Sequence, residues 1–296
     1  MSTVLTAHQT WATSQFSVSG ASGLYDRARP SYPTEATSLI LSRLPPSAVV
    51  VELGAGTGLF TRGLLAASSE LPEEKRIKTL TAVEPSEGMR EGFEKALVEK
   101  GLREGGKEGG RVGGTEVTVV DGTFEKVPVE EGSVDMVVIA QAFHWTGHDG
   151  SAAVKEIARV LKPGGIWAKI WNLEDRDTKW VAELRDVYEE FENDTPQYRH
   201  GYWKSIWSLP YFPTLFSSPE EHHVFQRSLP STANGVVDRV FSKSYITALS
   251  EEQRKEVERK CREIVKKGDG KKWIEEEKGV FEYPYKTDLF ITARKE

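Results

Sequence analysis

An acidic residue followed by alternating glycines is the first group in the chain that could do chemistry. Glu52 follows an apolar run, and Gly54, Gly56 and Gly58 come after it. Glycines let a backbone approach a ligand closely, and a helix beginning near Leu59 would point its amide groups at that ligand. The dinucleotide fingerprint Gly-x-Gly-x-x-Gly fails, because its third glycine would stand where this chain has leucine. The spacing predicts a nucleotide-binding loop and leaves its ligand open.

Two further groups follow later strands, at what should be the same edge of a sheet. Glu84 ends an apolar strand one βαβ unit after the loop, where a carboxylate can accept both ribose hydroxyls of a nucleoside. Residues 141–145 follow another buried strand, and ligands in open α/β sheets bind beyond such strand ends. Within this stretch, His144 could accept a proton from an acceptor molecule or could only orient it.

The hydrophobic pattern predicts the elements that must position these groups. Apolar runs and alternation indicate strands, whereas amphipathic spacing with capping residues indicates helices. The expected strands are 48–53, 77–83, 116–120, 134–140, 166–171, 222–229 and 280–293, and the expected helices are 34–44, 59–68, 86–100, 151–161, 236–249 and 251–267. Pro284 and Thr287 predict a bend or hairpin inside the last strand. Strands that alternate with helices in this way predict an α/β fold.

Together these motifs resemble those of the class I methyltransferases, which use S-adenosylmethionine (SAM). The loop reads Glu-Leu-Gly-Ala-Gly-Thr-Gly at 52–58, and residues 85–89 resemble the second motif of that family. Gln-Ala-Phe-His-Trp at 141–145 resembles the signature of small-molecule enzymes related to trans-aconitate methyltransferase, the methyltransferase type 11 group. Residues 25–33 and the Leu-Lys-Pro-Gly-Gly turn at 161–165 are similar to further family motifs.

The resemblance implies a single Rossmann-like domain over residues 1–296. Its sheet is expected to have seven mostly parallel strands with strand 7 antiparallel, helices on both faces, and a helical, aromatic lid insertion. Residues 1–33 are expected to form an N-terminal flap, and the glycine-rich and charged segment 101–115 a flexible loop. The segment 172–220 exceeds the one helix of a plain core and is rich in aromatic residues, which indicates a lid over a pocket.

The resemblance also implies which residues hold the cofactor and the acceptor. SAM is expected to contact Tyr25, Arg29, Glu52, Gly54, Ala55, Gly56, Gly58, Glu84, Pro85, Met89, Asp121, Thr123, Phe124 and Gln141. The acceptor is expected to contact Tyr32, His144, Trp145, Trp171, Trp203 and Trp207, with His144 facing the transferred methyl group. The family usually has an acid where this chain has Thr123, so Asp121 competes for the adenine contact.

Cationic side chains lie among the rings of segment 172–220 and could bind an anionic acceptor. They are Arg176, Lys179, Arg199 and His200. A solvent-exposed face would explain any one of them equally well.

Composition narrows the classes of partner. The net charge of -6 and the pI of about 5.7 disfavour a general nucleic-acid surface. The single cysteine, Cys261, excludes an internal disulfide and suits a reducing, cytoplasmic location. No apolar run reaches the ~20 residues of a membrane span. The adjacent His222 and His223 would point to opposite faces of a strand, so no metal site is assigned.

The expected reaction is transfer of the SAM methyl group to an O, N or S atom of a small molecule, such as a carboxylate or a bulky natural product. Catalysis would rest mostly on positioning and desolvation. Two alternatives stay open. One is a SAM-binding protein that does not methylate and acts as a regulator or a pericyclase. The other is an NAD-dependent dehydrogenase, although its glycine pattern is missing.

Overall fold

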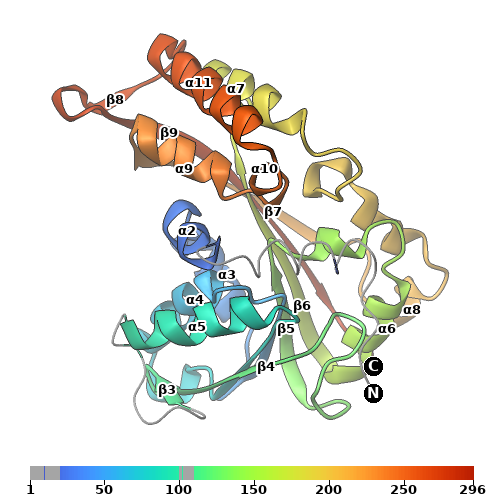
Figure 1. The fold of residues 1–296 in the computed structure, drawn as a ribbon. Helices are drawn as coiled ribbons and strands as arrows, with labels where there is room; N and C mark the ends of the chain where they lie inside the picture. Colours follow the sequence, from blue (N-terminus) through green and yellow to red (C-terminus); the bar gives the residue numbers. More distant parts are fainter. Residues whose placement is uncertain (1–9, 11–20, 100–101, 103–109) are drawn as a thin grey trace.

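The computed structural model describes residues 10, 21–99, 102 and 110–296, which build one mixed sheet with helices on both faces (Figure 1). The strand order is β3-β4-β2-β1-β5-β6-β9-β7, and β8 pairs with β9 outside this path. Strands β4, β2, β1, β5 and β6 run parallel, whereas β9 is antiparallel to both β6 and β7. The strands are β1 (Val49–Leu53), β2 (Thr79–Val83), β3 (Gly110–Val112), β4 (Thr115–Val120), β5 (Val134–Ala140), β6 (Leu161–Glu174), β7 (Glu221–Ser231), β8 (Trp273–Glu275) and β9 (Val280–Ala293).

Ten α-helices and short 3-10 turns connect the described strands. The helices are α2 (Ala21–Ala28), α3 (Thr34–Ser42), α4 (Leu59–Ser69), α5 (Glu87–Glu99), α6 (Ser151–Val160), α7 (Lys179–Glu189), α8 (Phe212–Leu215), α9 (Ala233–Phe241), α10 (Ser244–Thr247) and α11 (Glu251–Lys267). One of the 3-10 turns, η2 (Phe143–Thr146), follows β5. Two others, η3 (Tyr198–His200) and η4 (Tyr202–Ser208), follow α7.

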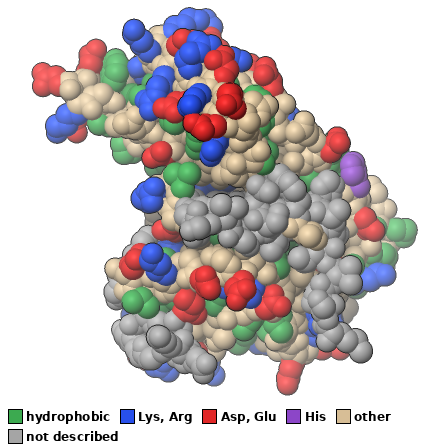
Figure 2. Space-filling view, viewed as in Figure 1, with side chains coloured by type: hydrophobic (Ala, Val, Ile, Leu, Met, Phe, Trp, Pro, Cys, Tyr) green, Lys and Arg blue, Asp and Glu red, His purple; other side chains and the backbone are tan. Residues whose placement is uncertain are grey.

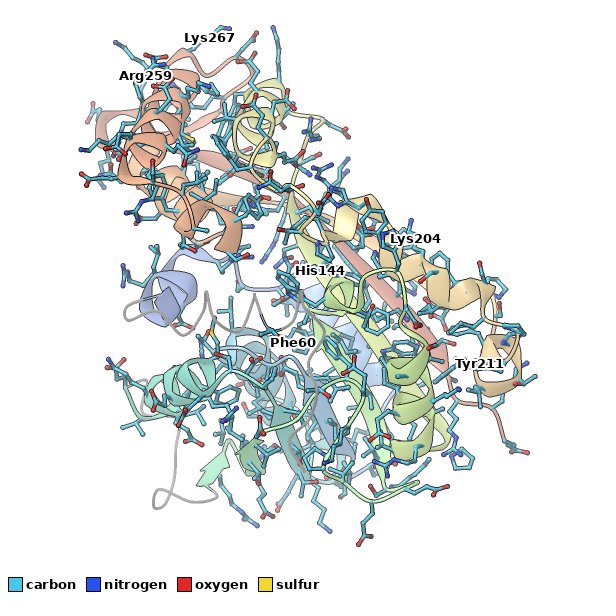
Figure 3. All side chains as sticks on the ribbon, turned by 45° about the vertical axis from the view of Figure 1, so that its right-hand side comes forward. Phe60, His144, Lys204, Tyr211, Arg259 and Lys267 are labelled. Carbon is cyan, nitrogen blue, oxygen red and sulfur yellow. The ribbon has the colours of Figure 1, made fainter. Side chains whose placement is uncertain are left out.

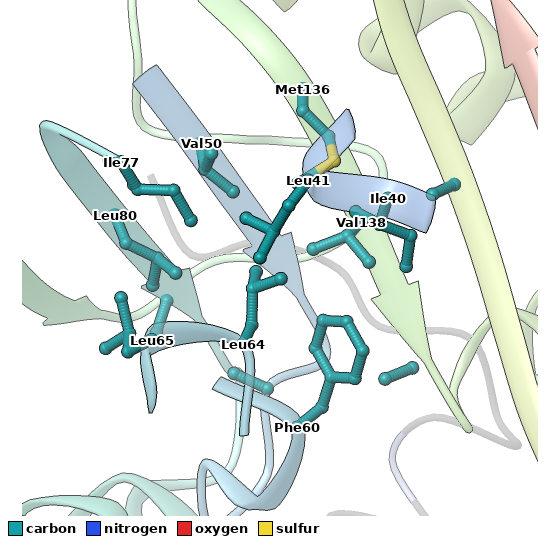
Figure 4. Close-up of a cluster of buried hydrophobic side chains, with 14 of the residues drawn as sticks. Ile40, Leu41, Val50, Phe60, Leu64, Leu65, Ile77, Leu80, Met136 and Val138 are labelled. Carbon is teal, nitrogen blue, oxygen red and sulfur yellow. The ribbon is translucent and has the colours of Figure 1, made fainter. Parts of the chain in front are cut away.

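Alternate residues of the central strands enter two separate cores, because side chains of a strand point to opposite faces in turn. Val50 and Val138 pack with α3 and α4 in the cluster shown in Figure 4. Their neighbours Val51 and Val137 pack on the other face with α6, η4 and α8. Both faces are therefore covered, as a parallel strand with apolar side chains on both faces requires.

A third core lies where α7, α9 and α11 pack together against the first residues of β9. Trp180, Leu184, Val240 and Cys261 are buried in it. Figure 1 shows these helices above the central sheet, with α11 on the outside. Acidic and basic side chains are intermingled on this outer surface in Figure 2. Within the described residues, no helix combines the length and apolar character that crossing a membrane requires.

The fold class is confirmed, but the count of seven strands is wrong. The seven expected strands are all present, and β3 and β8 are added as short antiparallel strands. β3 forms within the segment 101–115, whose residues 100–101 and 103–109 lie outside the described part of the chain. The expected helix 236–249 divides into α9 and α10, because Lys243 adopts extended backbone between them.

The predicted bend or hairpin in the last strand is also wrong, because β9 is continuous and pairs on both sides. The last β6 pair joins Glu174 to Tyr285, and the carbonyl of Pro284 accepts a hydrogen bond from the amide of Asp175 beyond it. The nitrogen and carbonyl of a strand residue point to the same side in an antiparallel ladder. The missing N–H of Pro284 therefore faces Asp175 as well, so the reciprocal bond to the carbonyl of Asp175 cannot form and the pairing with β6 ends there while β9 continues.

Candidate active site

The parallel strands end at one edge of the sheet and bring the predicted motifs together there. The glycine loop joins β1 to α4, Glu84 follows β2, and Gln141 follows β5. Register explains the convergence, since Leu53 pairs with Val83 and the amide of Glu84 bonds to the carbonyl of Val120. This edge is where open α/β sheets bind ligands.

Two glycines of the loop have different roles. Gly56 has a φ of +57°, lines the main cavity, and a side chain there would meet no atom within 4 Å. Gly58 has a φ of +74°, but a Cβ there would lie 2.4 Å from the ring of Phe93. Gly56 thus keeps space open for a ligand, whereas Gly58 lets the start of α4 pack against α5.

Glu84 is a buried carboxylate held by backbone amides. Its Oε2 accepts a hydrogen bond from the N–H of Gly56 at 2.9 Å, and its Oε1 accepts one from the N–H of Ser86 at 2.9 Å. Burial raises the pKa of Glu84, although these two bonds and the charge of Arg90 oppose the increase. Each carboxylate oxygen has a second acceptor site, so the pair of oxygens can also receive two hydroxyl groups.

Glu52 lies deeper, beneath the glycine loop. It accepts a hydrogen bond from the hydroxyl of Thr61 on α4. Burial raises the pKa of Glu52 to about 8, against that bond and the charge of Arg62. Arg62 pairs with Asp26 of α2 and donates to the carbonyl of Thr57 at 2.5 Å, which ties the N-terminal helix to the loop.

The side chains after β2 and β4 form the next wall. Pro85, Met89, Thr123 and Phe124 all line the cavity, and the last three are buried. Asp121 does not line it, because its exposed side chain pairs with Arg90 at 3.2 Å. Of the two candidates for the adenine contact, Thr123 is the one at the cavity.

Gln141 and His144 occupy the tip of β5. Gln141 has a φ of 56°, a region that residues other than glycine seldom adopt, and its Nε2 donates to the carbonyl of Asn172 at 2.6 Å. His144 is buried in η2, and its Nδ1 accepts a hydrogen bond from the indole N–H of Trp171 at 3.3 Å. Burial, with the charges of Arg29 and His200, lowers the pKa of His144 to about 3. The ring is therefore neutral near pH 7.

The main cavity has an empty volume of about 1320 Å³, including its open mouth. One end is the edge of the sheet just described. The other end, which we call the charged chamber, is lined by Glu174, Arg185, Tyr188, Glu189, Glu192, Gln197, Tyr198, Arg199, Arg239, Lys243, Ser244 and Tyr245. In Figure 3, His144 lies between the central sheet and the helices that supply these residues.

Glu174 is the centre of a charge cluster in the chamber. Its Oε1 lies 2.9 Å from Arg239 and 3.2 Å from Lys243, and Arg185 donates to its backbone carbonyl at 2.8 Å. Burial alone would raise the pKa of Glu174, but these three cations outweigh it and hold the pKa well below its usual value. Burial and the charge of Arg239 lower the pKa of Lys243 to about 7, against the attraction of Glu174.

Most of the predicted site residues gather at the main cavity or at a smaller one beside it. Arg29, Gly54, Gly56, Glu84, Pro85, Met89, Thr123, Phe124, Gln141, His144 and Trp145 line the main cavity. Tyr32, Glu52 and Ala55 line the smaller one, which shares Arg29 and Gln141 with the first. Tyr25 lies in α2, and its side chain is outside the described part of the structure.

Five predicted residues do not line either cavity: Gly58, Asp121, Trp171, Trp203 and Trp207. Trp171 and Trp203 are fully buried in the core on the α6 face, so their rings pack the protein instead of facing the open space. Trp207 is 40% exposed and contacts Trp203 and Phe290. Trp171 still reaches the site indirectly, through its bond to His144.

Sequence reasoning missed most of the charged chamber. Of the four cations suggested from the sequence, Arg199 lines the chamber, whereas Arg176, Lys179 and His200 do not. Glu174, Arg239 and Lys243 had no local signal, because they come from β6, α9 and the link to α10 and meet only in the folded chain. In the described residues, no three His, Cys, Asp or Glu side chains gather as a metal site.

Similarity to known proteins extends over most of the chain. The family described as "Methyltransferase domain" matches residues 51–168. An uncharacterized methyltransferase of Mycobacterium tuberculosis is 31% identical over 246 residues, covering 82% of this chain and 83% of that protein. An uncharacterized methyltransferase-like protein of Schizosaccharomyces pombe is 28% identical over 244 residues, with the same coverage of 82% and 83%. A solved structure of a candidate type II methyltransferase from Anaeromyxobacter dehalogenans shares the fold, with a TM-score of 0.55, 19% identity, and coverage of 90% and 97%.

Proposed function

Because this chain belongs to the SAM-dependent methyltransferases, we propose that it methylates a small molecule that carries a carboxylate group. The cofactor would occupy the edge of the sheet, and the acceptor would occupy the charged chamber. An oxygen, nitrogen or sulfur atom of the acceptor would receive the methyl group, and a carboxylate oxygen is the acceptor atom that the charges favour.

The residues at the sheet edge fit SAM. The open space in front of Gly56 would admit the methionine part, and the second acceptor sites of Glu84 would receive the ribose hydroxyls. Met89 and Phe124 would pack on the adenine, with Thr123 at its polar edge. When bound there, SAM supplies a sulfonium methyl group that is already activated for attack. The chain then has only to position the acceptor and exclude water.

His144 and Trp145 would contact both molecules, because they line the cavity between its two ends. Segment 172–220 would cover the acceptor through α7 and η3, which supply much of the chamber wall. The aromatic surface of Tyr198 and Trp145 would pack on the apolar part of the acceptor.

The charge of the chamber is the observation that carries the proposal. The chamber has four lining cations, Arg185, Arg199, Arg239 and Lys243, against three carboxylates, Glu174, Glu189 and Glu192, while Arg29 and Glu84 line the cavity outside the chamber. A buried excess of positive charge is costly unless an anion compensates it. Arg29 would serve the carboxylate of the cofactor, and the remaining excess suits one carboxylate on the acceptor.

A cationic acceptor is disfavoured, because the chamber carboxylates already have partners. Glu189 pairs with Arg176, Arg185 and Arg199. Glu192 pairs with Arg199 and accepts a hydrogen bond from Tyr245. An amine would have to displace these contacts, whereas the Nζ of Lys243 has donors to spare beyond its bond to Glu174.

The direct test is transfer of label from methyl-labelled SAM to a panel of small carboxylic acids, each paired with its primary amide, and to a panel of amines. Mass spectrometry would identify the methylated products. We expect label on one or more of the acids and none on the matched amides. Label on amines alone would contradict the carboxylate proposal. Calorimetric binding of SAM without transfer to any fraction of a metabolite extract would favour the non-methylating alternative.

A further inference from the structure

The hydrogen bond between Trp171 and His144 determines where the imidazole carries its proton. The indole N–H of Trp171 can only donate, and it points at Nδ1 of His144 across 3.3 Å. Nδ1 must therefore present its lone pair. In a neutral imidazole the single proton is then on Nε2, the other ring nitrogen.

The donor cannot turn away, because Trp171 is fully buried among other rings. Its ring centroid lies 4.6 Å from that of Tyr198, 4.7 Å from that of Trp203 and 6.1 Å from that of Phe290. Close packing of this kind leaves a large side chain one rotamer. The indole N–H is thus a fixed feature of the wall behind His144.

Protonation of His144 would break this arrangement. A charged imidazolium carries a proton on both nitrogens, and its Nδ1–H would face the indole N–H directly. The groups around His144 also disfavour its protonation. Burial and the nearby charges of Arg29 and His200 lower the pKa of the ring. An imidazole that remains neutral and has its proton on Nε2 is a hydrogen-bond donor and lacks a free lone pair for a proton.

We propose that Trp171 is a positioning residue that fixes His144 as an Nε2–H donor, so that His144 orients the acceptor and does not act as a general base. This rests on the proposed function. The acceptor must then reach the site already deprotonated, as a carboxylate does. The lone pair of its oxygen forms the new C–O bond, the C–S bond breaks with its electron pair on sulfur, and the sulfonium charge and the carboxylate charge both disappear. No proton is transferred.

Nitrogen NMR of the protein with labelled histidine tests the tautomer without any acceptor. The signal of His144 is assigned by its loss in His144→Gln. We expect the neutral Nε2–H form between pH 5 and pH 8 in the wild type, and a mixture of both tautomers in Trp171→Phe. Trp203→Phe is the matched control, because Trp203 packs against Trp171 and donates to the carbonyl of Tyr198, not to His144. A proton on Nδ1, a protonation midpoint within that pH range, or an unchanged signal in Trp171→Phe would overturn the proposal.

Kinetics with labelled SAM and the acceptor from the acid panel tests the role in the reaction. Glutamine offers an N–H at about the reach of Nε2 and cannot accept a proton, so His144→Gln should keep kcat within roughly 10-fold of the wild type. His144→Leu lacks the donor and should lose roughly 10- to 100-fold. Equal loss in both variants would indicate a base and overturn the proposal. If no carboxylic acid is methylated, the proposed function fails, whereas the NMR result still decides the tautomer.

Discussion

The indole N–H of Trp171 donates a hydrogen bond to Nδ1 of His144, although Trp171 itself never reaches the cavity that His144 lines. The tryptophan belongs to the packed core behind the site, and the histidine belongs to the wall in front of it. A core residue thus determines which ring nitrogen of His144 carries the proton at the site.

Replacement of Glu84 by glutamine should weaken SAM binding. The change removes the charge that would accept the ribose hydroxyls, and hydrogen bonds to charged groups contribute roughly 1.5–3 kcal/mol, or about a 10- to 100-fold change in affinity. Asp121→Asn is the matched control, because Asp121 is exposed and does not line the cavity. Calorimetric titration would measure both. Equal affinities for Glu84→Gln and the wild type would remove Glu84 from the cofactor site.

The two loop glycines should respond differently to alanine. In Gly56→Ala the methyl group enters open space, so the free energy of unfolding should fall only by the roughly 1–2 kcal/mol that a non-glycine residue costs in left-handed backbone. The affinity for SAM should fall at least about 10-fold, because the methyl group occupies the space of the ligand. In Gly58→Ala the Cβ meets the ring of Phe93, and overpacking should bring the total loss to roughly 2–5 kcal/mol. Denaturant unfolding compares their stabilities. Similar stabilities for the two variants would contradict these roles.

Glu52 should make stability fall as the pH rises. Its folded pKa of about 8 lies above the unfolded value of 4.5, so the folded state binds more protons between these limits. The stabilisation that Glu52 contributes is then complete below pH 4.5 and is lost as the pH rises to about 8. Between pH 5 and pH 7 the free energy of unfolding should fall by on the order of 3 kcal/mol. Glu52→Gln mimics the protonated form and should flatten the profile. Urea unfolding at several pH values, with the exposed Glu73→Gln as control, would check this. A profile in Glu52→Gln as steep as in the wild type would show that another group is responsible.

Lys243 should give the KM of a carboxylate acceptor a pH dependence. The protonated lysine binds the acceptor best, and its pKa in the free protein is about 7, so KM should be lowest below pH 7 and should rise from pH 7 to pH 9. Lys243→Met should raise KM at pH 6 by roughly 10- to 100-fold and should abolish the rise. Lys204→Met is the control, because Lys204 does not line the chamber. A KM in Lys243→Met that still rises with pH would place the titrating group elsewhere.

The sequence was sufficient for the cofactor end of the site because its determinants are local. A strand, a glycine loop and a helix carry Gly54 and Gly56 as one continuous segment, and Glu84 follows the next strand. Parallel pairing then brings these segments to one edge without further information. The antiparallel direction of β9, the expected strand 7, followed from the family resemblance.

The charged chamber could not be predicted, because it depends on packing between distant segments. Glu174 meets Arg239 and Lys243 only because α9 packs over the end of β6. Trp203 and Trp207 were expected at the acceptor because aromatic residues suit both a lid and a core, and hydrophobicity alone cannot separate these roles. Trp203 is buried in the core on the α6 face, and Trp207 packs on the outer side of Trp203.

We propose that the charged chamber selects a carboxylate acceptor for SAM-dependent methylation. The most direct measurement is the ratio of kcat/KM for a carboxylic acid and its matched primary amide, with methyl-labelled SAM at saturation and below pH 7. We expect the acid to be favoured by at least about 100-fold, because the amide would leave the buried cations uncompensated. Equal kcat/KM values for the acid and the amide would contradict it.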